Sequence, residues 1–184
     1  EQLPQPFYAK MITVTNHYPY TLDKANQTIE KTDTGDDTVD GYVQTARYLD
    51  EALGEFFNWL KETGLYDKSM IVLYGDHYGI SNNHKKAMAK LTNISGFNDY
   101  NNAMYQRVPF MIHMPGLKGG INHTYGGEID ALPTILNLLG VKDNDTVQFG
   151  SDLLSADHPQ TVAFRNGDFV TPDFTKVGSQ YFNT

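Results

Sequence analysis

The chain has no cysteine among its 184 residues, which excludes disulfide bonds, thiolate catalysis and cysteine-ligated zinc. It also has no apolar run near the ~20 residues that span a bilayer, and no signal peptide is recognisable at its start. Basic residues are scarce, with 14 Lys and Arg against 22 Asp and Glu. This excludes a nucleic-acid partner, because binding to nucleic-acid phosphates needs a basic stripe.

The remaining composition is that of an ordinary globular protein, 40% hydrophobic and 20% charged. A chain of this length supports one domain with a sizeable core, which buries roughly 70% of the surface of the unfolded chain. The first residue is Glu1 and not methionine. We therefore expect either a processed chain or a piece of a longer protein.

Hydrophobic patterns predict alternating strands and helices. Short runs rich in β-branched and aromatic residues predict strands over residues 7–15, 69–74 and 107–114. Apolar residues at three-and-four spacing predict a long helix over residues 40–63, ended by Gly64. Shorter helices are expected over 85–91 and over 130–139, the latter capped by Asp130.

The order of these elements predicts an α/β fold with a mostly parallel sheet flanked by helices. Near the end of the chain, Asn166-Gly167 and Thr171-Pro172 predict hairpins and therefore a small antiparallel C-terminal sheet. We expect residues 1–184 to form part of one domain. About 1–145 would supply the core sheet and helices, and about 146–184 the small strands.

The most informative polar residues are Asp76 and His77, directly after the predicted strand 69–74 and between Gly75 and Gly79. In open α/β sheets ligands bind at the carboxyl ends of strands. One carboxylate beside one imidazole suits manganese, zinc or magnesium, and glycine lets the backbone turn to aim both side chains. The residues alone leave open a second interpretation, in which Asp76 caps a turn and His77 is a buried, satisfied histidine.

His17 follows the first predicted strand in the same way. It could donate a hydrogen bond to an anionic oxygen or act as a general acid, or it could simply pack in its loop against Tyr18 and Tyr20. Because parallel strands bring their carboxyl ends to one rim, we expect His17 and His77 to face one cleft. The other histidines are not expected to be ligands: His84, His113, His123 and His158.

Three segments in one order resemble motifs of the alkaline phosphatase and sulfatase superfamily. They are the Asp-His metal motif IVLYGDH at 71–77, the strand RVPFMIHMPG at 107–116 and the helix GEIDALPTILNLLGV at 127–141. A closer resemblance, over nearly the whole chain, is to the lipoteichoic acid synthases of Gram-positive bacteria. It rests on ITVTNHYPY at 12–20, GDHYGISNNHKKAM at 75–88 and FRNGDF at 164–169.

That resemblance implies a glycerophosphotransferase at the extracellular face of the bacterial membrane, reached through the parent protein, or a secreted domain released from it. In this family a threonine activated by Mn²⁺, with Mg²⁺ or Zn²⁺ as alternatives, attacks the phosphate of phosphatidylglycerol. Diacylglycerol leaves, and the resulting glycerophosphoryl-threonine passes its group to a growing polyglycerolphosphate chain.

Matched residue by residue, the resemblance makes Asp76 and His77 two metal ligands and His17 a substrate contact, with Tyr78 lining the glycerol pocket. The nucleophilic threonine and a glutamate ligand of the family lie upstream, so no catalytic nucleophile is assigned here. We expect this chain to need the missing N-terminal half and to be inactive alone. The alternatives are a sulfatase or phosphatase-type hydrolase of the same superfamily and a non-catalytic binding module.

Overall fold

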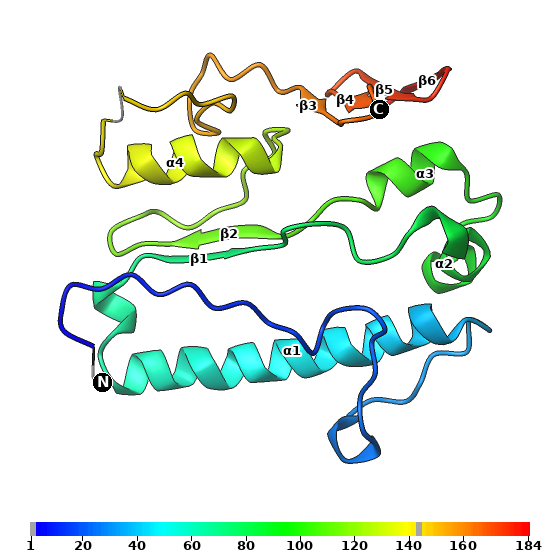
Figure 1. Ribbon diagram of the computed structural model, residues 1–184, viewed down its shortest axis with the longest axis horizontal. Coiled ribbons are helices and arrows are strands. Elements are labelled where there is room, and N and C mark those ends of the chain that lie inside the picture. Colours follow the sequence, from blue (N-terminus) through cyan, green and yellow to red (C-terminus); the bar gives the residue numbers. More distant parts are fainter. Residues whose placement is uncertain (1–2, 143–144) are drawn as a thin grey trace. The chain divides into compact units, whose positions relative to one another are not determined.

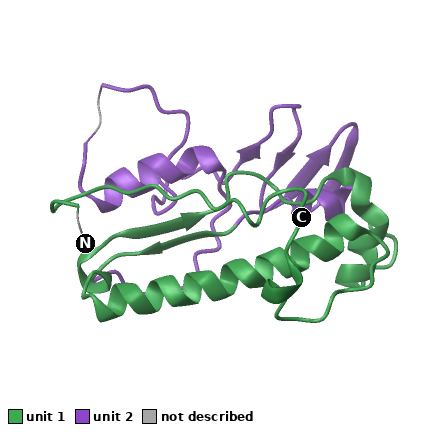
Figure 2. Ribbon diagram, turned by 60° about the horizontal axis from the view of Figure 1, so that its bottom comes forward, with its two compact units in different colours: residues 1–97, 109–115 green, residues 98–108, 116–184 purple. Residues whose placement is uncertain are grey.

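The computed structural model describes residues 3–142 and 145–184, which divide into two compact units (Figure 2). Unit 1 holds the residues up to Phe97 together with Pro109–Pro115, and unit 2 holds Asn98–Val108 and the residues from Gly116 onward. Among the described residues, no helix is both long and apolar enough to cross a bilayer.

Helix α1, Asp37–Glu62, is the longest element of unit 1 (Figure 1) and confirms the predicted helix 40–63. It starts earlier than its apolar stripe because Asp36 caps it. One carboxylate oxygen of Asp36 accepts hydrogen bonds from the backbone N–H groups of Thr38 and Val39, at 3.0 and 3.3 Å. These bonds satisfy donors that the first helical turn leaves unpaired.

Strands β1, Ile71–Tyr74, and β2, Phe110–His113, form a two-stranded sheet in unit 1. They confirm the strands predicted over 69–74 and 107–114, and with the helices they confirm the α/β class. The pairing is antiparallel, with Tyr74 opposite Phe110. The predicted mostly parallel sheet is not confirmed, since both sheets of the described residues are antiparallel. The long connection from β1 to β2 allows either direction, so element order alone could not decide it.

The buried strand predicted over residues 7–15 is wrong for this structure. The segment forms no strand, and its large apolar side chains face solvent, with Tyr8 86%, Ile12 73% and Val14 77% exposed. A strand needs a neighbour for its backbone N–H and C=O groups. No strand among the described residues pairs with this segment.

The rest of unit 1 is irregular chain with a few short helical elements. Helix α2, Lys85–Thr92, confirms the predicted helix 85–91. The three 3₁₀ turns of this unit are η1, Lys24–Asn26, η2, Tyr66–Lys68, and η3, Asn82–His84.

Unit 2 contains helix α3, Asp99–Met104, the turn η4, Glu128–Asp130, and helix α4, Ala131–Leu138. Helix α4 confirms the predicted helix 130–139. The sequence patterns did not predict helix α3, which is stabilised by a capping box between Asn98 and Asn101. Asp130 occupies the predicted N-cap position of α4, but its side chain makes no cap hydrogen bond there and instead accepts from the Gly127 N–H at the start of η4.

The end of unit 2 is a four-stranded antiparallel sheet in the order β3-β4-β5-β6. The strands are β3, Val162–Ala163, β4, Phe169–Val170, β5, Phe174–Val177, and β6, Gln180–Asn183. The small C-terminal sheet is therefore confirmed. The turn between β3 and β4 contains Gly167 at a φ of +84°, which glycine adopts without strain.

The chain buries little apolar surface. Its exposed area is 13345 Å², whereas a compact monomer of this mass would expose about 8,900 Å² and two separate proteins of half the mass about 10,700 Å². Only five apolar side chains among the described residues are buried: Tyr20, Val39, Leu60, Ala87 and Val170. The large core expected from chain length is thus not formed by these residues alone.

Candidate active site

Asp76 and His77 lie just beyond the carboxyl end of strand β1. The ladder continues one step past Tyr74, because the Gly75 N–H donates to the Pro109 carbonyl at 3.0 Å. Immediately beyond it, Asp76 Oδ1 and His77 Nε2 lie 3.7 Å apart, with 74% and 54% of their side chains exposed. The two side chains face one another, and neither is buried.

Among the residues that the structure describes, His77 makes a hydrogen bond through one ring nitrogen, and the other is available to a ligand. Its Nδ1 lies 2.8 Å from the carbonyl oxygen of Tyr78. Because a carbonyl oxygen only accepts, Nδ1 carries the proton, and Nε2 of the neutral ring presents its lone pair on the side of Asp76. Metal-binding histidines in proteins are oriented in this way, with the other ring nitrogen donating to an acceptor.

His17 lies beside His77, as we expected, although the first predicted strand is not formed. The two imidazole rings meet edge to face, with centroids 5.7 Å apart and planes at 87°. His17 Nδ1 lies 2.9 Å from the carbonyl oxygen of Tyr18, so its Nε2 is also unprotonated in the neutral ring. What brings the rings together is a turn packed on α1 and not a shared sheet edge.

Tyr78 extends this patch on the other side of His77. Its ring is 50% exposed and meets the imidazole of His77 edge to face at 6.4 Å. The structure therefore brings all four predicted residues, His17, Asp76, His77 and Tyr78, into one open patch of unit 1. Their roles stay predictions.

The patch fits part of a metal site. Asp76 and His77 offer one carboxylate oxygen and one imidazole nitrogen, the mixed donor set that suits manganese, magnesium or zinc. Among the described residues there is no group of three or more histidine and acidic side chains able to hold a metal ion. Catalytic metal sites usually have three or more protein ligands, so this pair would be one portion of a larger set.

Three other histidines have structural partners. His84 Nδ1 lies 2.7 Å from the second carboxylate oxygen of Asp36. His113 stacks on Tyr66 with ring centroids 3.9 Å apart. His158 is buried in unit 2, where its side chain is 2% exposed.

Sequence reasoning missed the residues that hold the patch on α1. Tyr20 is 5% exposed, and its ring meets Tyr42 of α1 edge to face at 5.3 Å. Its hydroxyl donates to the carbonyl oxygen of Gly79. We had placed Tyr20 only as packing against His17. The one signal in the sequence was its position after a proline, which does not indicate a partner 59 residues away.

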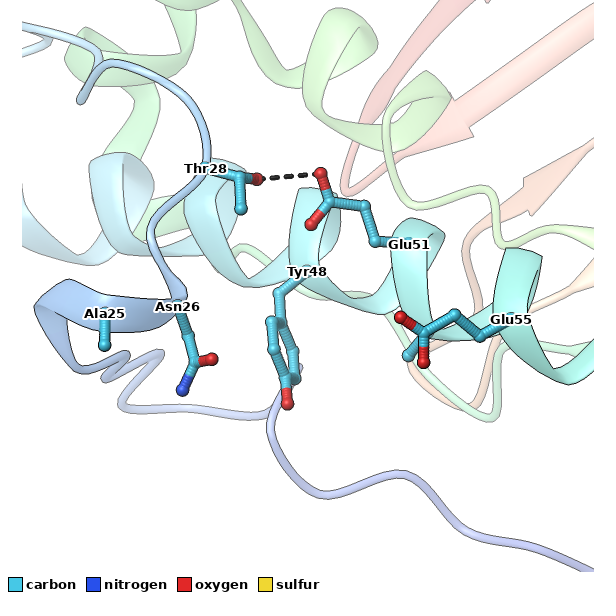
Figure 3. A pocket seen from close by; sticks show the side chains of 7 residues that line it. Ala25, Asn26, Thr28, Tyr48, Glu51 and Glu55 are labelled. Atoms are coloured by element: carbon cyan, nitrogen blue, oxygen red, sulfur yellow. Dashed lines mark hydrogen bonds between the residues drawn. The ribbon is translucent and has the colours of Figure 1, made fainter.

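A hollow of about 270 Å³ lies elsewhere on unit 1, between η1 and the outer face of α1 (Figure 3). Thr28 donates to Glu51 at its rim. Its lining carries two carboxylates and no basic side chain, so it is unsuited to an anionic phosphate donor. The lining residues are Ala25, Asn26, Thr28, Tyr48, Glu51, Ala52 and Glu55.

Comparison with known proteins identifies a family and several related proteins of known name. Residues 1–141 match the sulfatase family. Over its whole length the chain is 58% identical to lipoteichoic acid synthase 1 and 52% identical to lipoteichoic acid synthase 2 of Bacillus subtilis. Over 99% of its length it is 52% identical to the lipoteichoic acid synthase of Staphylococcus aureus. The chain spans 28–29% of the length of these relatives.

Proposed function

This chain belongs to the sulfatase family, as its motifs predicted, and on that premise we propose that it is part of a glycerophosphotransferase. The protein would move glycerol phosphate from phosphatidylglycerol to a growing polyglycerolphosphate chain at the extracellular face of the membrane. The observation that carries the proposal is the shared patch of His17, Asp76 and His77 in a chain 58% identical to a lipoteichoic acid synthase.

Asp76 and His77 are proposed to hold a divalent ion, with Mn²⁺ preferred. When bound, such an ion acts as a Lewis acid that neutralises charge on phosphate oxygens and lowers the pKa of a nucleophile. The contribution of this chain is orientation. In the neutral ring of His77, the carbonyl of Tyr78 holds the proton on Nδ1, and this leaves the lone pair of Nε2 available to a ligand.

His17 is proposed to contact the glycerophosphate. With its proton on Nδ1, the neutral ring accepts a hydrogen bond at Nε2 from a glycerol hydroxyl, and the imidazolium donates one to a phosphate oxygen. Tyr78 supplies an exposed aromatic face beside the same patch, which suits the carbon backbone of glycerol.

The nucleophile is proposed to lie in another part of the protein, N-terminal to this segment. In the family it is a threonine that forms a covalent glycerophosphoryl intermediate, and no threonine here stands in a matching context. The exposed apolar segment 7–15 supports this arrangement, because it has strand-forming residues and pairs with no strand in the described part of the chain. We propose that it pairs with a strand from the remainder of the catalytic domain, and that residues 1–184 alone are inactive.

The test is product analysis with the full-length protein. Incubation with phosphatidylglycerol and Mn²⁺, followed by mass spectrometry, should show polymers lengthened by glycerol phosphate units together with diacylglycerol. Free glycerophosphate without polymer would replace the transferase by a hydrolase of the same superfamily. If neither polymer nor free glycerophosphate formed, and the protein also bound no Mn²⁺, the remaining interpretation would be a non-catalytic binding module.

A second assay uses residues 1–184 alone with a fluorescent phosphatidylglycerol and the same ion. We expect no turnover, because the chain lacks the nucleophile and part of the ligand set. Robust product from this polypeptide would contradict the proposed division of the active site.

A further inference from the structure

Tyr20 is bonded to both of the loops that carry the candidate histidines. Its backbone N–H donates to the carbonyl of His17 at 2.9 Å. Its hydroxyl donates to the carbonyl of Gly79, two residues beyond His77. Burial, and then the neighbouring Tyr42, raise the pKa of the Tyr20 phenol, so it remains a protonated donor at neutral pH.

Helix α1 holds this connection tightly. A Cβ atom added to Gly41 of α1 would lie 2.6 Å from the backbone oxygen of Tyr20. A Cβ added to Gly79 would lie 2.6 Å from Cε2 of Tyr42. Both loops therefore press on α1 with no room for a methyl group.

The histidines do not set their own spacing. Within the described residues, each imidazole Nδ1 bonds only to the carbonyl of the residue that follows it. Their rings meet at 5.7 Å because the two backbones are held at a given distance. On the first loop, Thr45 of α1 adds a 3.2 Å hydrogen bond to the side chain of Asn16. Between the two loops, the side-chain hydrogen bond is that of Tyr20.

We propose that Tyr20 is a positioning residue, which sets the spacing of His17 and His77 by tying the loop of one to the backbone of the other at Gly79. This inference rests on the proposed function, because the spacing matters for catalysis only if both histidines act on one substrate. Tyr20 itself touches neither metal nor substrate in this scheme. Its effect passes through the two backbones.

The decisive variant is Tyr20→Phe in the full-length protein, which removes the hydroxyl and keeps the ring. Tyr181→Phe is the matched control, because the same atom is removed from a residue of β6 that is 67% exposed and lies outside the candidate site. In the metal-free protein we expect hydrogen exchange of segments 12–20 and 75–84 to quicken severalfold in Tyr20→Phe. Exchange in the sheet β3–β6 should be unchanged.

The second measurement is Mn²⁺ titration. Loss of an outer-shell orienting group typically costs about 10- to 100-fold in metal affinity or activity, and we expect about tenfold weaker Mn²⁺ binding. Excess Mn²⁺ should restore part of the lost kcat in Tyr20→Phe. A merely structural defect would lower the melting temperature and would not respond to the ion.

Wild-type exchange and wild-type Mn²⁺ affinity in Tyr20→Phe would overturn the inference while leaving the proposed function intact. If the wild-type protein itself bound no Mn²⁺ and transferred no glycerophosphate, the proposed function would fail. The exchange rates of the metal-free protein would still decide whether Tyr20 ties the loops.

A separate variant keeps the inference testable if Tyr20→Phe does not fold. Gly79→Ala should push the loop off Tyr42 and produce the same defects in exchange and Mn²⁺ binding. Adding Tyr42→Leu should relieve the clash and recover part of the affinity. Unchanged exchange and affinity in Gly79→Ala would contradict the proposed tie.

Discussion

Two aspartate–histidine pairs in this protein have nearly the same separation and opposite surroundings. In unit 1, Asp76 Oδ1 and His77 Nε2 are 3.7 Å apart, and the side chains are 74% and 54% exposed. In unit 2, Asp130 Oδ2 and His158 Nε2 are 3.9 Å apart, and the side chains are 6% and 2% exposed. Residue type and distance therefore do not distinguish the two pairs.

Hydrogen-bonding capacity does distinguish them. In the buried pair, the Asp130 carboxylate accepts from the backbone N–H groups of Gly127 and Ser151, both at 2.8 Å. His158 Nε2 donates to the Tyr125 carbonyl at 2.8 Å, and Nδ1 accepts from the Ser151 hydroxyl at 2.6 Å. Both ring nitrogens are thus used. In the exposed pair, Nε2 of His77 is open, and that open lone pair is what a metal needs.

The largest effect is expected from removing the exposed carboxylate. In the full-length protein, Asp76→Asn should lower kcat/KM by about 1,000-fold, about 4 kcal/mol, since a metal supplies several kcal/mol of transition-state stabilisation. The melting temperature should change little, because Asp76 is exposed. Steady-state kinetics would check this against Asp67→Asn, which removes the charge of another exposed aspartate. Equal activity of both variants would contradict the assignment of Asp76 as a metal ligand.

A change in the buried pair, Asp130 and His158, should lower stability and leave Mn²⁺ binding unchanged. Asp130→Ala removes a buried carboxylate, leaves the part-buried N–H groups of Gly127 and Ser151 without this acceptor, and should lower the free energy of unfolding by about 3 kcal/mol. The folded fraction should bind Mn²⁺ as tightly as wild type. Urea unfolding would measure the loss, with the exposed Asp157→Ala as control. A folded Asp130→Ala protein of unchanged stability but weaker Mn²⁺ binding would move the metal site to unit 2.

His17 and the Asp76–His77 pair are proposed to have different roles in the exposed patch, substrate binding and metal binding. Because it is proposed to contact substrate, His17→Asn should lower kcat/KM by about 100-fold, as loss of a positioned proton-transfer or hydrogen-bonding group does. Mn²⁺ affinity should not change. Paired kinetics and metal titration would separate the two roles, with the exposed His123→Asn as control. Weaker Mn²⁺ binding in His17→Asn would instead make His17 a ligand.

The smallest effect concerns Asp36, which connects α1 to η3. The hydrogen bond from His84 lowers the pKa of Asp36, and its bonds to the first turn of α1 act in the same direction against burial. A carboxyl group with a lowered pKa in the folded state stabilises the fold above its unfolded pKa. That stabilisation is lost as pH falls through the folded pKa.

Asp36→Asn tests this dependence, because asparagine keeps the helix cap and removes the charge. We expect wild type to be more stable than Asp36→Asn by about 1 kcal/mol at neutral pH. The difference should disappear near pH 2. Chemical unfolding at both pH values would measure it, and a difference that persisted in acid would show that the charge of Asp36 is not involved.

Local patterns in the sequence predicted most of the elements. The three-and-four spacing predicted α1, and the short apolar runs predicted β1 and β2, because both kinds of pattern follow from backbone geometry within one element. Segment 7–15 failed for the opposite reason. Its residues are typical of a strand, but a strand also needs a partner, and the described residues offer none.

For the candidate site, too, the sequence determined some features and the tertiary structure determined the others. That Asp76 and His77 are adjacent, and that glycines flank them, was determined by the sequence alone, since covalent neighbours stay together in any fold. Which aspartate–histidine pair stays open, and how far His17 lies from His77, were decided only by the tertiary structure. The physical reason is that burial and hydrogen-bond saturation depend on contacts between residues distant in the chain, such as Tyr20 with Gly79.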